Sequence, residues 1–188
     1  MNVGVAPPIA CTVLALAPSA NPDAASEGDL VLSLTIKPAP IRKSFVVNAS
    51  QAHAFEVFTD GFDRWWPRTH HIGKTPLKRV VLEPGVGGRW YSVHEGGEEQ
   101  PWGDVLEWEP PSRLVLAWRI DHTFHCDPNL LTEVEVRFTP LNDNQTQVDF
   151  EHRHLERFGD SEAALQTLTR MDGGWGLILG HYQTVVEA

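Results

Sequence analysis

Basic residues are scarce in this chain of 188 residues. Fifteen Lys and Arg stand against 25 Asp and Glu, so the formal net charge is −10. Proteins that bind the phosphate backbone of nucleic acids depend on Lys and Arg to displace counterions, and basic clusters likewise hold segments on anionic membranes. The acidic balance therefore favours neither a nucleic acid nor a membrane surface as a partner.

Cysteines and long apolar runs are also few. Cys11 and Cys126 are too few for a disulfide framework or a zinc ribbon, and they favour free thiols in a reducing compartment. No apolar run approaches the ~18–20 residues that cross a bilayer. An apolar stretch at 9–17 resembles part of a signal peptide, but no Lys or Arg precedes Lys37 to form its basic start. We therefore expect a cytoplasmic protein.

Motifs for nucleophilic catalysis and for phosphate binding are missing as well. The chain has no Gly-x-Ser-x-Gly sequence, and Cys126 has no clear base outside its own loop. The stretch Gly85–Gly88 leads into an expected strand rather than a helix, so it indicates a turn and not a nucleotide site. His122, His125 and Cys126 are zinc-ligand types, but no second pair with ligand spacing is near them. We expect no metal and no cofactor.

The first 40 residues differ in composition from the rest. Residues 1–29 contain four prolines, many Ala and Ser, and no aromatic residue. Such a segment buries too little apolar surface to offset its ordering entropy. We expect residues 1–29 to form a disordered extension and 30–40 a linker. Residues 41–188 are long enough for one domain with its own core.

The hydrophobic pattern from Ile41 onward predicts a strand, two short helices, six more strands and one long helix. Alternation is clear where Val134, Val136 and Phe138 are separated by charged residues, as in a strand with one wet face. Short connections between the strands are typical of an antiparallel meander. The expected strands are 41–47, 77–83, 87–94, 102–108, 113–120, 131–139 and 146–153, and the expected helices run from an N-cap at Ser50 to 59, over 62–66, and from about 160 to 186.

The last helix carries an apolar stripe at three- and four-residue steps. Its members are Leu165, Leu168, Trp175, Leu179, Tyr182 and Val186. Gly173 and Gly174 interrupt the stripe, which indicates a kink, a close approach of the helix to the sheet, or local weakening of the helix. An antiparallel sheet with a single long helix cannot bury both of its faces, so the sheet must curl around that helix. This α+β arrangement leaves a cavity that suits a small molecule.

Short motifs follow one another along the domain. They are Phe62–Pro67, Glu83–Trp90, Trp102–Leu114, Thr132–Phe138, Phe150–Arg153 and Gly173–Trp175. With these motifs the chain, from about Ile41 to its C-terminus, resembles the START-like or SRPBCC superfamily and, within it, the family named for the activator of the heat-shock-protein-90 ATPase.

The resemblance implies a helix-grip fold, a curled antiparallel sheet wrapped around a long C-terminal helix with two short helices after the first strand. It leaves function open, because ligand carriers, aromatase and cyclase enzymes and protein-binding modules share this fold. Residues 1–40 are too short and polar to match the separate chaperone-binding domain of the family's cochaperone.

Aromatic residues point to an apolar ligand in the expected cavity. Trp65, Trp66, Trp90, Trp102, Trp118 and Trp175 form a set in which at least two are expected at the pocket wall. Our first hypothesis is a module that binds a small, mostly apolar ligand. The predicted ligand-binding residues are Trp66, Trp90, Trp118, Phe150, His152, Trp175 and Leu179.

His152 is the candidate for chemistry, because it follows Val148 and Phe150 on the inner face of its strand. There it would hydrogen-bond a ligand oxygen or act as an acid or base near neutral pH, as in an aromatase, cyclase or hydrolase-like enzyme. The opposing interpretation is a core histidine whose hydrogen bonds are satisfied within the protein.

Loop and surface residues allow two further interpretations. The adjacent His70 and His71 are typical of solvated loop residues without a specific role. The alternative is that this pair gates the entry of a ligand into the cavity. The third hypothesis for the whole domain is an interaction module that binds a chaperone, a signalling partner or a second copy of the chain, and a large exposed apolar patch would favour it.

Overall fold

The computed structural model describes residues 38–188. The expected extension, 1–29, lies outside this range, as does the expected linker up to residue 37. Residues 38–40 have no regular secondary structure and lead directly into the first strand.

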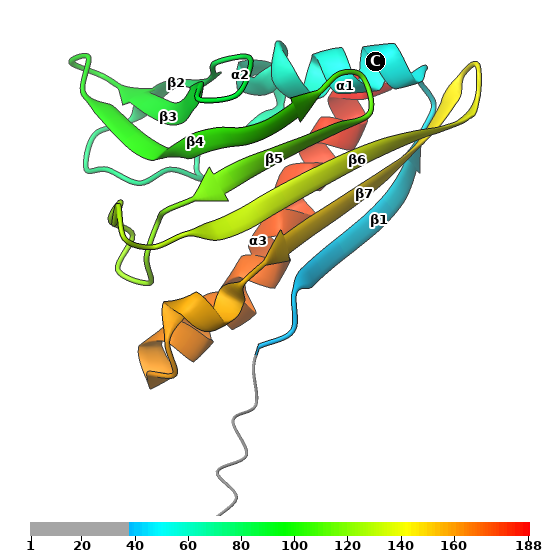
Figure 1. The fold of residues 1–188 in the computed structure, drawn as a ribbon. Helices are drawn as coiled ribbons and strands as arrows, with labels where there is room; N and C mark the ends of the chain where they lie inside the picture. Colours follow the sequence, from blue (N-terminus) through cyan, green and yellow to red (C-terminus); the bar gives the residue numbers. More distant parts are fainter. Residues whose placement is uncertain (1–37) are drawn as a thin grey trace, which may run out of the picture. The chain divides into compact units, whose positions relative to one another are not determined.

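The described residues form one seven-stranded antiparallel sheet with helices on one side of it (Figure 1). The strand order is β1-β7-β6-β5-β4-β3-β2, so every neighbouring pair except β1 and β7 is consecutive in the chain. The strands are β1 (Ile41–Val47), β2 (Leu77–Leu82), β3 (Arg89–His94), β4 (Glu99–Glu109), β5 (Arg113–Trp118), β6 (Thr132–Asn142) and β7 (Gln145–Arg153). The helices are α1 (Gln51–Thr59), α2 (Phe62–Trp65) and α3 (Glu162–Val186), with a 3₁₀ turn at Leu155–Phe158.

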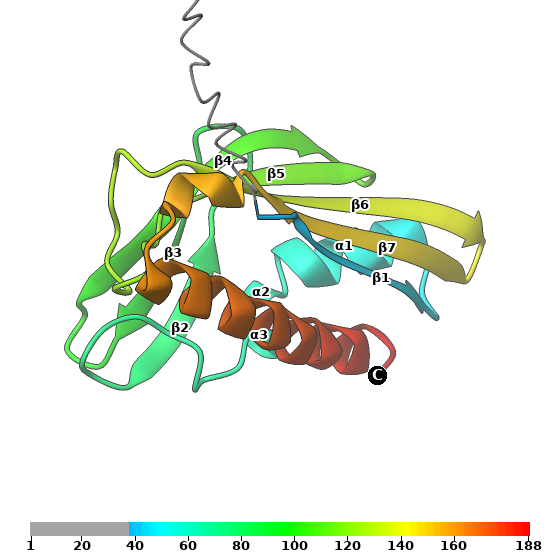
Figure 2. The ribbon, with the colours of Figure 1, turned by 90° about the horizontal axis from the view of Figure 1, so that it is seen from below.

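This architecture confirms the expected helix-grip fold. The sheet curls, and α3 runs along the same side of it as α1 and α2, as the view from below makes plain (Figure 2). Every expected strand and helix is present, and their ends move by a few residues. The 3₁₀ turn before α3 is the one element that the pattern did not predict, because four residues are too few to show a period.

Side-chain caps fix the starts of two helices where the sequence predicted them. The Ser50 hydroxyl accepts a hydrogen bond from the backbone N–H of His53 at 3.4 Å, and Ser161 accepts one from Ala164 at 3.2 Å. Such caps satisfy a backbone donor that the first helical turn leaves free. The start of α3 therefore agrees with the sequence to within a residue or two.

The apolar stripe of α3 faces the sheet, with one correction. Leu168, Trp175, Leu179, Tyr182 and Val186 are buried as expected, but Leu165 is 48% exposed. Ala164 takes the inward position in the first turn instead, and its neighbour Leu165 is turned about 100° around the helix axis.

The glycines of α3 do not mark a close approach. The helix continues through Gly173 and Gly174, and a Cβ added at either position would meet no atom within 4 Å. Of the three alternatives that the sequence left open for these glycines, a close approach of the helix to the sheet is therefore not what the structure has. Gly174 instead leaves room beside Trp175.

Tyr182 joins α3 to the helices near the start of the domain. It is fully buried, and its hydroxyl donates to the carbonyl of Ala54 in α1 at 2.8 Å. Its ring meets the rings of Phe58 and Trp65 edge to face, at centroid distances of 5.2 and 5.4 Å. These contacts close one end of the space under the sheet, so the open space lies toward the other end of α3.

Candidate ligand-binding site

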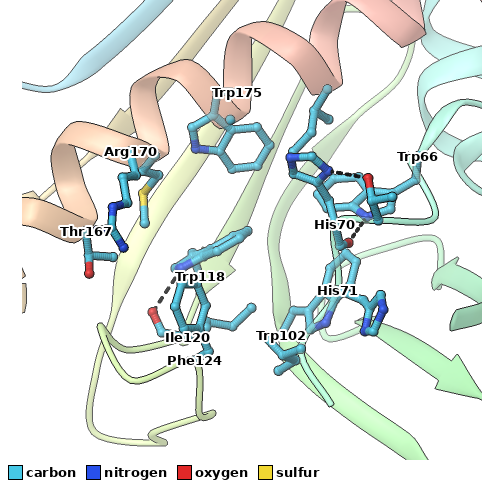
Figure 3. A pocket seen from close by; sticks show the side chains of 15 residues that line it. Trp66, His70, His71, Trp102, Trp118, Ile120, Phe124, Thr167, Arg170 and Trp175 are labelled. Carbon is cyan, nitrogen blue, oxygen red and sulfur yellow. Dashed lines mark hydrogen bonds between the residues drawn. The ribbon is translucent and has the colours of Figure 1, made fainter. Parts of the chain in front are cut away.

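A pocket of about 270 Å³ opens between the sheet, α3 and the loop that follows α2 (Figure 3). Four tryptophans from four separate segments form its wall: Trp66 after α2, Trp102 in β4, Trp118 at the end of β5 and Trp175 in α3. The other lining residues are Thr69, His70, His71, Ile72, Ile120, Phe124, Thr167, Arg170, Met171, Gly174 and Ile178. The pocket is therefore mainly aromatic, with polar groups added by the loop and by α3.

The tryptophan rings of the wall touch one another. Trp66 and Trp102 lie at a centroid distance of 4.7 Å, and Trp118 and Trp175 at 5.4 Å. Trp66 also meets Trp175 edge to face at 6.1 Å. These distances fall in the range of favourable aromatic pairs, so each ring helps to hold the next.

Hydrogen bonds fix three of the four indole groups. The N–H of Trp66 donates to the carbonyl of His70 at 2.6 Å, which ties the loop after α2 to the wall. The N–H of Trp118 donates to the carbonyl of Ile120 at 3.0 Å. The N–H of Trp175 donates to Nδ1 of His152 at 3.2 Å.

His152 lies behind Trp175 and is completely buried. An indole N–H only donates, so Nδ1 of His152 is an acceptor and its proton is on Nε2. Nε2 then donates to the Thr132 hydroxyl at 2.8 Å, and that hydroxyl donates to the carbonyl of Trp118 at 3.1 Å. The chain of hydrogen bonds thus links two tryptophans of the pocket wall through one histidine.

Burial lowers the pKa of His152 to about 3, so the ring is neutral at physiological pH. Both ring nitrogens already have partners inside the protein. This arrangement is that of a satisfied core histidine, although its partners are a tryptophan and a threonine rather than a carbonyl or a carboxylate.

The seven predicted ligand-binding residues fall into two groups. Trp66, Trp118 and Trp175 line the pocket. Trp90, Phe150, His152 and Leu179 are buried and do not line it. Strand and helix periodicity predicts the face that a side chain occupies, but it does not predict how deep in that face the side chain lies.

The residues of the second group support the wall from behind. The indole N–H of Trp90 donates to the carbonyl of Ala117 at 2.7 Å, and its ring lies 5.4 Å from that of Trp118. The ring of Phe150 lies 4.6 Å from that of Trp175. Substitutions at these positions would therefore reach the pocket through the tryptophans.

The pocket also contains polar residues that the sequence did not assign to it. Thr167 and Arg170 come from α3, and Thr69 from the loop after α2. Arg170 forms no ion pair with any other residue of the described range 38–188. Nothing in their spacing along the sequence connects the loop with the helix, because only the fold brings the two together.

The two loop histidines lie in the pocket wall rather than in open solvent. Burial, and then the nearby charge of His181, lower the pKa of His70. Nδ1 of His71 is buried and has no hydrogen-bond partner among residues 38–188, and the same is true of the indole N–H of Trp102. A buried polar group without a partner costs about 1–3 kcal/mol, so the pocket holds hydrogen-bonding capacity that the described protein does not use.

The loop with His122, His125 and Cys126 is organised by an aspartate. One carboxylate oxygen of Asp121 accepts from the backbone N–H groups of Thr123 and His125, at 2.8 and 3.0 Å. Burial raises the pKa of the Cys126 thiol. Within the described part of the chain, no three His, Cys, Asp or Glu side chains are grouped to hold a metal ion. Nor is any helix of that part long and apolar enough to cross a membrane.

Comparisons with known proteins found a matching family and solved structures with a similar sequence and fold. A model of the family "Activator of Hsp90 ATPase homolog 1-like protein" matches residues 48–187. An anthrahydroquino-gamma-pyrone synthase, Txn09, is 39% identical, and the match covers 79% of this chain and 97% of that one, with a TM-score of 0.58. The self-sacrificing resistance protein CalC from Micromonospora echinospora is 33% identical over 78% of this chain and 93% of its own, with a TM-score of 0.59.

A more distant structure shares the fold alone. The Aha1 dimer from Colwellia psychrerythraea is 15% identical, and the match covers 80% of this chain and 97% of that one, with a TM-score of 0.56. A comparison with curated proteins found no match.

Proposed function

This chain belongs to the Activator of Hsp90 ATPase homolog 1-like family, and from that premise we propose that it binds a small, flat, largely apolar molecule in its tryptophan-walled pocket. The observation that carries the proposal is the wall itself. Four indole rings border one pocket, and hydrogen bonds hold three of them in place. Gly174 of α3 also lines the pocket and, having no side chain, leaves this space open. Aromatic faces held in place in this way favour stacking with another flat ring.

The dimensions of the pocket limit the ligand. A volume of about 270 Å³ lies just below the usual range of about 300–1,000 Å³ for pockets that hold drug-sized molecules. A compact molecule of two or three fused rings suits this space better than a long lipid chain. The name of the 39%-identical relative, a synthase of an anthrahydroquinone-pyrone, supports the same class of ligand.

A second candidate function is a ring-closing reaction on such a ligand. The similarity to the synthase favours it, together with the Trp102 N–H and His71 Nδ1 of the pocket, which have no hydrogen-bond partner among residues 38–188. His152 is a poor acid or base for this chemistry, because both of its nitrogens are engaged and its pKa is far below neutral. The general acid or base of such a reaction would therefore be His70 or His71, which line the pocket.

A role as an interaction module has less support. The exposed large apolar side chains of the described residues are spread over several elements and loops. They are Val46, Val86, Phe124, Leu141, Leu165 and Leu177. Such scattered residues are ordinary on a protein surface.

A substitution that fills the pocket tests the binding proposal. Gly174 lines the pocket, and a Cβ added there meets no atom within 4 Å, so a leucine at this position starts from open space and is expected to occupy part of the pocket. Gly173→Leu is the matched control, because Gly173 is the adjacent helix residue and does not line the pocket. We expect anthracene-2-sulfonate, titrated by its fluorescence, to bind the wild type and Gly173→Leu saturably and Gly174→Leu at least about tenfold more weakly. Equal binding by all three proteins would overturn the proposal.

A further inference from the structure

One tryptophan of the pocket wall differs from the other three. The indole N–H groups of Trp66, Trp118 and Trp175 each donate to an acceptor in the protein. That of Trp102 has no acceptor among residues 38–188, although the side chain lines the pocket and only 1% of the residue is exposed. Bulk water therefore does not serve as its partner, and a buried donor of this kind is uncommon in native proteins.

A second unpartnered atom belongs to the same pocket. Three buried side-chain polar atoms of the described range lack a partner, and two of them, Trp102 Nε1 and His71 Nδ1, come from lining residues. Figure 3 shows these two residues on the same side of the pocket, across from Trp118 and Trp175. The third atom is the hydroxyl oxygen of Thr75, a few residues along the loop from His71.

The loop that carries His71 is held against the sheet by another histidine. Nδ1 of the buried His94 donates to the carbonyl of Thr75 at 2.7 Å, so Nε2 of His94 accepts from the Ser92 hydroxyl at 3.0 Å. The rings of His71 and His94 meet at a centroid distance of 5.1 Å. Gly73 allows this approach, because its φ is +115° and a Cβ there would lie 2.8 Å from the His94 ring. His71 is thus positioned by a buried, satisfied neighbour while its own Nδ1 stays unpartnered.

We propose that the Trp102 N–H is the donor for a ligand oxygen, so that the pocket selects flat aromatic molecules that carry a carbonyl or phenolic oxygen over plain hydrocarbons. The inference rests on the proposed function and adds the chemical class of the ligand. An indole N–H can only donate, so its partner must be an acceptor. A carbonyl in the plane of an aromatic ring system presents its lone pairs at the edge of the rings, which leaves the faces free to stack on the tryptophans. His71 Nδ1 is available for a second oxygen or for a hydroxyl.

Two probes of matched charge and shape test this selectivity. Anthracene-2-sulfonate and anthraquinone-2-sulfonate share three fused rings and one sulfonate, and they differ in the two carbonyl oxygens. We expect the wild type to bind the quinone about three- to tenfold more tightly, which is the net worth of one hydrogen bond. Trp102→Phe keeps a ring in the wall and removes the donor, so the ratio of the two affinities should fall to about one.

Trp108→Phe is the matched control on the same strand. Trp108 packs against Phe55 at 5.4 Å and does not line the pocket, so this variant should keep the wild-type ratio. The ratio cancels any general weakening of the pocket by a substitution. A ratio near one in the wild type, or a preference for the quinone that survives Trp102→Phe, would overturn the inference and leave the binding proposal intact. Binding of neither probe to the wild type would overturn both.

A measurement on the unmodified protein covers the case in which Trp102→Phe does not fold. In ¹H–¹⁵N spectra, a hydrogen bond from the Trp102 indole N–H to a probe carbonyl should move the indole proton signal downfield. We expect this downfield shift with anthraquinone-2-sulfonate and not with anthracene-2-sulfonate. Equal shifts with the two probes would count against the proposed role of Trp102.

Discussion

The indole N–H of Trp175 donates to Nδ1 of His152 at 3.2 Å, and this contact couples the pocket wall to strand β7, which lies next to the edge strand β1. Trp175 comes from α3 and His152 from β7. From His152 the hydrogen bonds continue through Thr132 to the carbonyl of Trp118. Two tryptophans of the wall are therefore fixed by a histidine that lies behind the wall rather than in it.

Removing this histidine should destabilise the domain. His152→Ala leaves the Trp175 N–H without its acceptor, removes the N–H that donates to the Thr132 hydroxyl, and opens a cavity behind the wall. We expect a loss of about 2–4 kcal/mol in the free energy of unfolding, measured by urea denaturation. His53→Ala, at a half-exposed position on α1, should change stability by less than about 0.5 kcal/mol. A stable His152→Ala protein would show that the hydrogen-bonded chain contributes little.

The neutral state of His152 should make stability depend on pH. Its pKa is about 3 in the folded protein and about 6.5 when unfolded, so between these values the unfolded state binds the extra proton. The stability that the domain gains from the neutral, buried His152 is fully present above pH 6.5 and is lost progressively as the pH falls toward 3.

The test is urea denaturation between pH 4.5 and 6.5, above the range in which most carboxylates titrate. His152→Gln offers the same donor and acceptor types without a titrating ring. We expect the wild type to lose stability, relative to this variant, by up to about 1.4 kcal/mol per pH unit on acidification. Parallel pH profiles for the two proteins would mean that His152 is not buried in its neutral form.

A carboxylate on the other face of the sheet should matter for stability rather than for binding. Glu135 in β6 is 3% exposed and forms ion pairs with Arg113, Arg137 and Arg153. Burial alone would raise the pKa of Glu135, but the hydrogen bond and charge of Arg113 and the charges of the other two arginines lower it below its usual value. Glu135→Gln removes the charge that these arginines share.

We expect Glu135→Gln to lower the free energy of unfolding by about 2–3 kcal/mol. Glu109→Gln, which removes an exposed partner of Arg113, should cost less than about 1 kcal/mol. Affinity for anthracene-2-sulfonate should be unchanged in both variants, because neither residue lines the pocket. Weaker probe binding by Glu135→Gln would show that this ion-pair group acts on the pocket.

Local sequence signals predicted most of the fold. Alternation along β6 and β7 and the hydroxyl caps at Ser50 and Ser161 depend on neighbours within a few residues, so the sequence alone contains them. The error at Leu165 arose because Leu165 and Ala164 both fit a three- or four-residue step, and apolarity pointed to the larger side chain. The smaller one is inward.

The site was harder to predict because it depends on how deeply each side chain is buried and on contacts between segments that are distant in the sequence. His152 was correctly placed on the inner face, but the sequence could not show that Trp175 would lie over it, from a helix 23 residues further along. Trp102 belonged to the expected aromatic set, yet the fact that its N–H has no acceptor within the part of the chain that the structure describes is visible only in the folded domain. Arg170 and Thr167 carried no signal, since exposed polar residues on a helix are ordinary.

The indole N–H signals of the seven tryptophans test the central claim most directly, because each reports from a known place in the fold. Anthracene-2-sulfonate added to ¹⁵N-labelled protein should shift the signals of the wall residues Trp66, Trp118 and Trp175 saturably, with one common dissociation constant. The signals of Trp65 and Trp108, which do not line the pocket, should stay in place. Unchanged wall signals at saturating probe, or larger shifts at Trp65 and Trp108 than at the wall, would contradict the account of this pocket as a binding site.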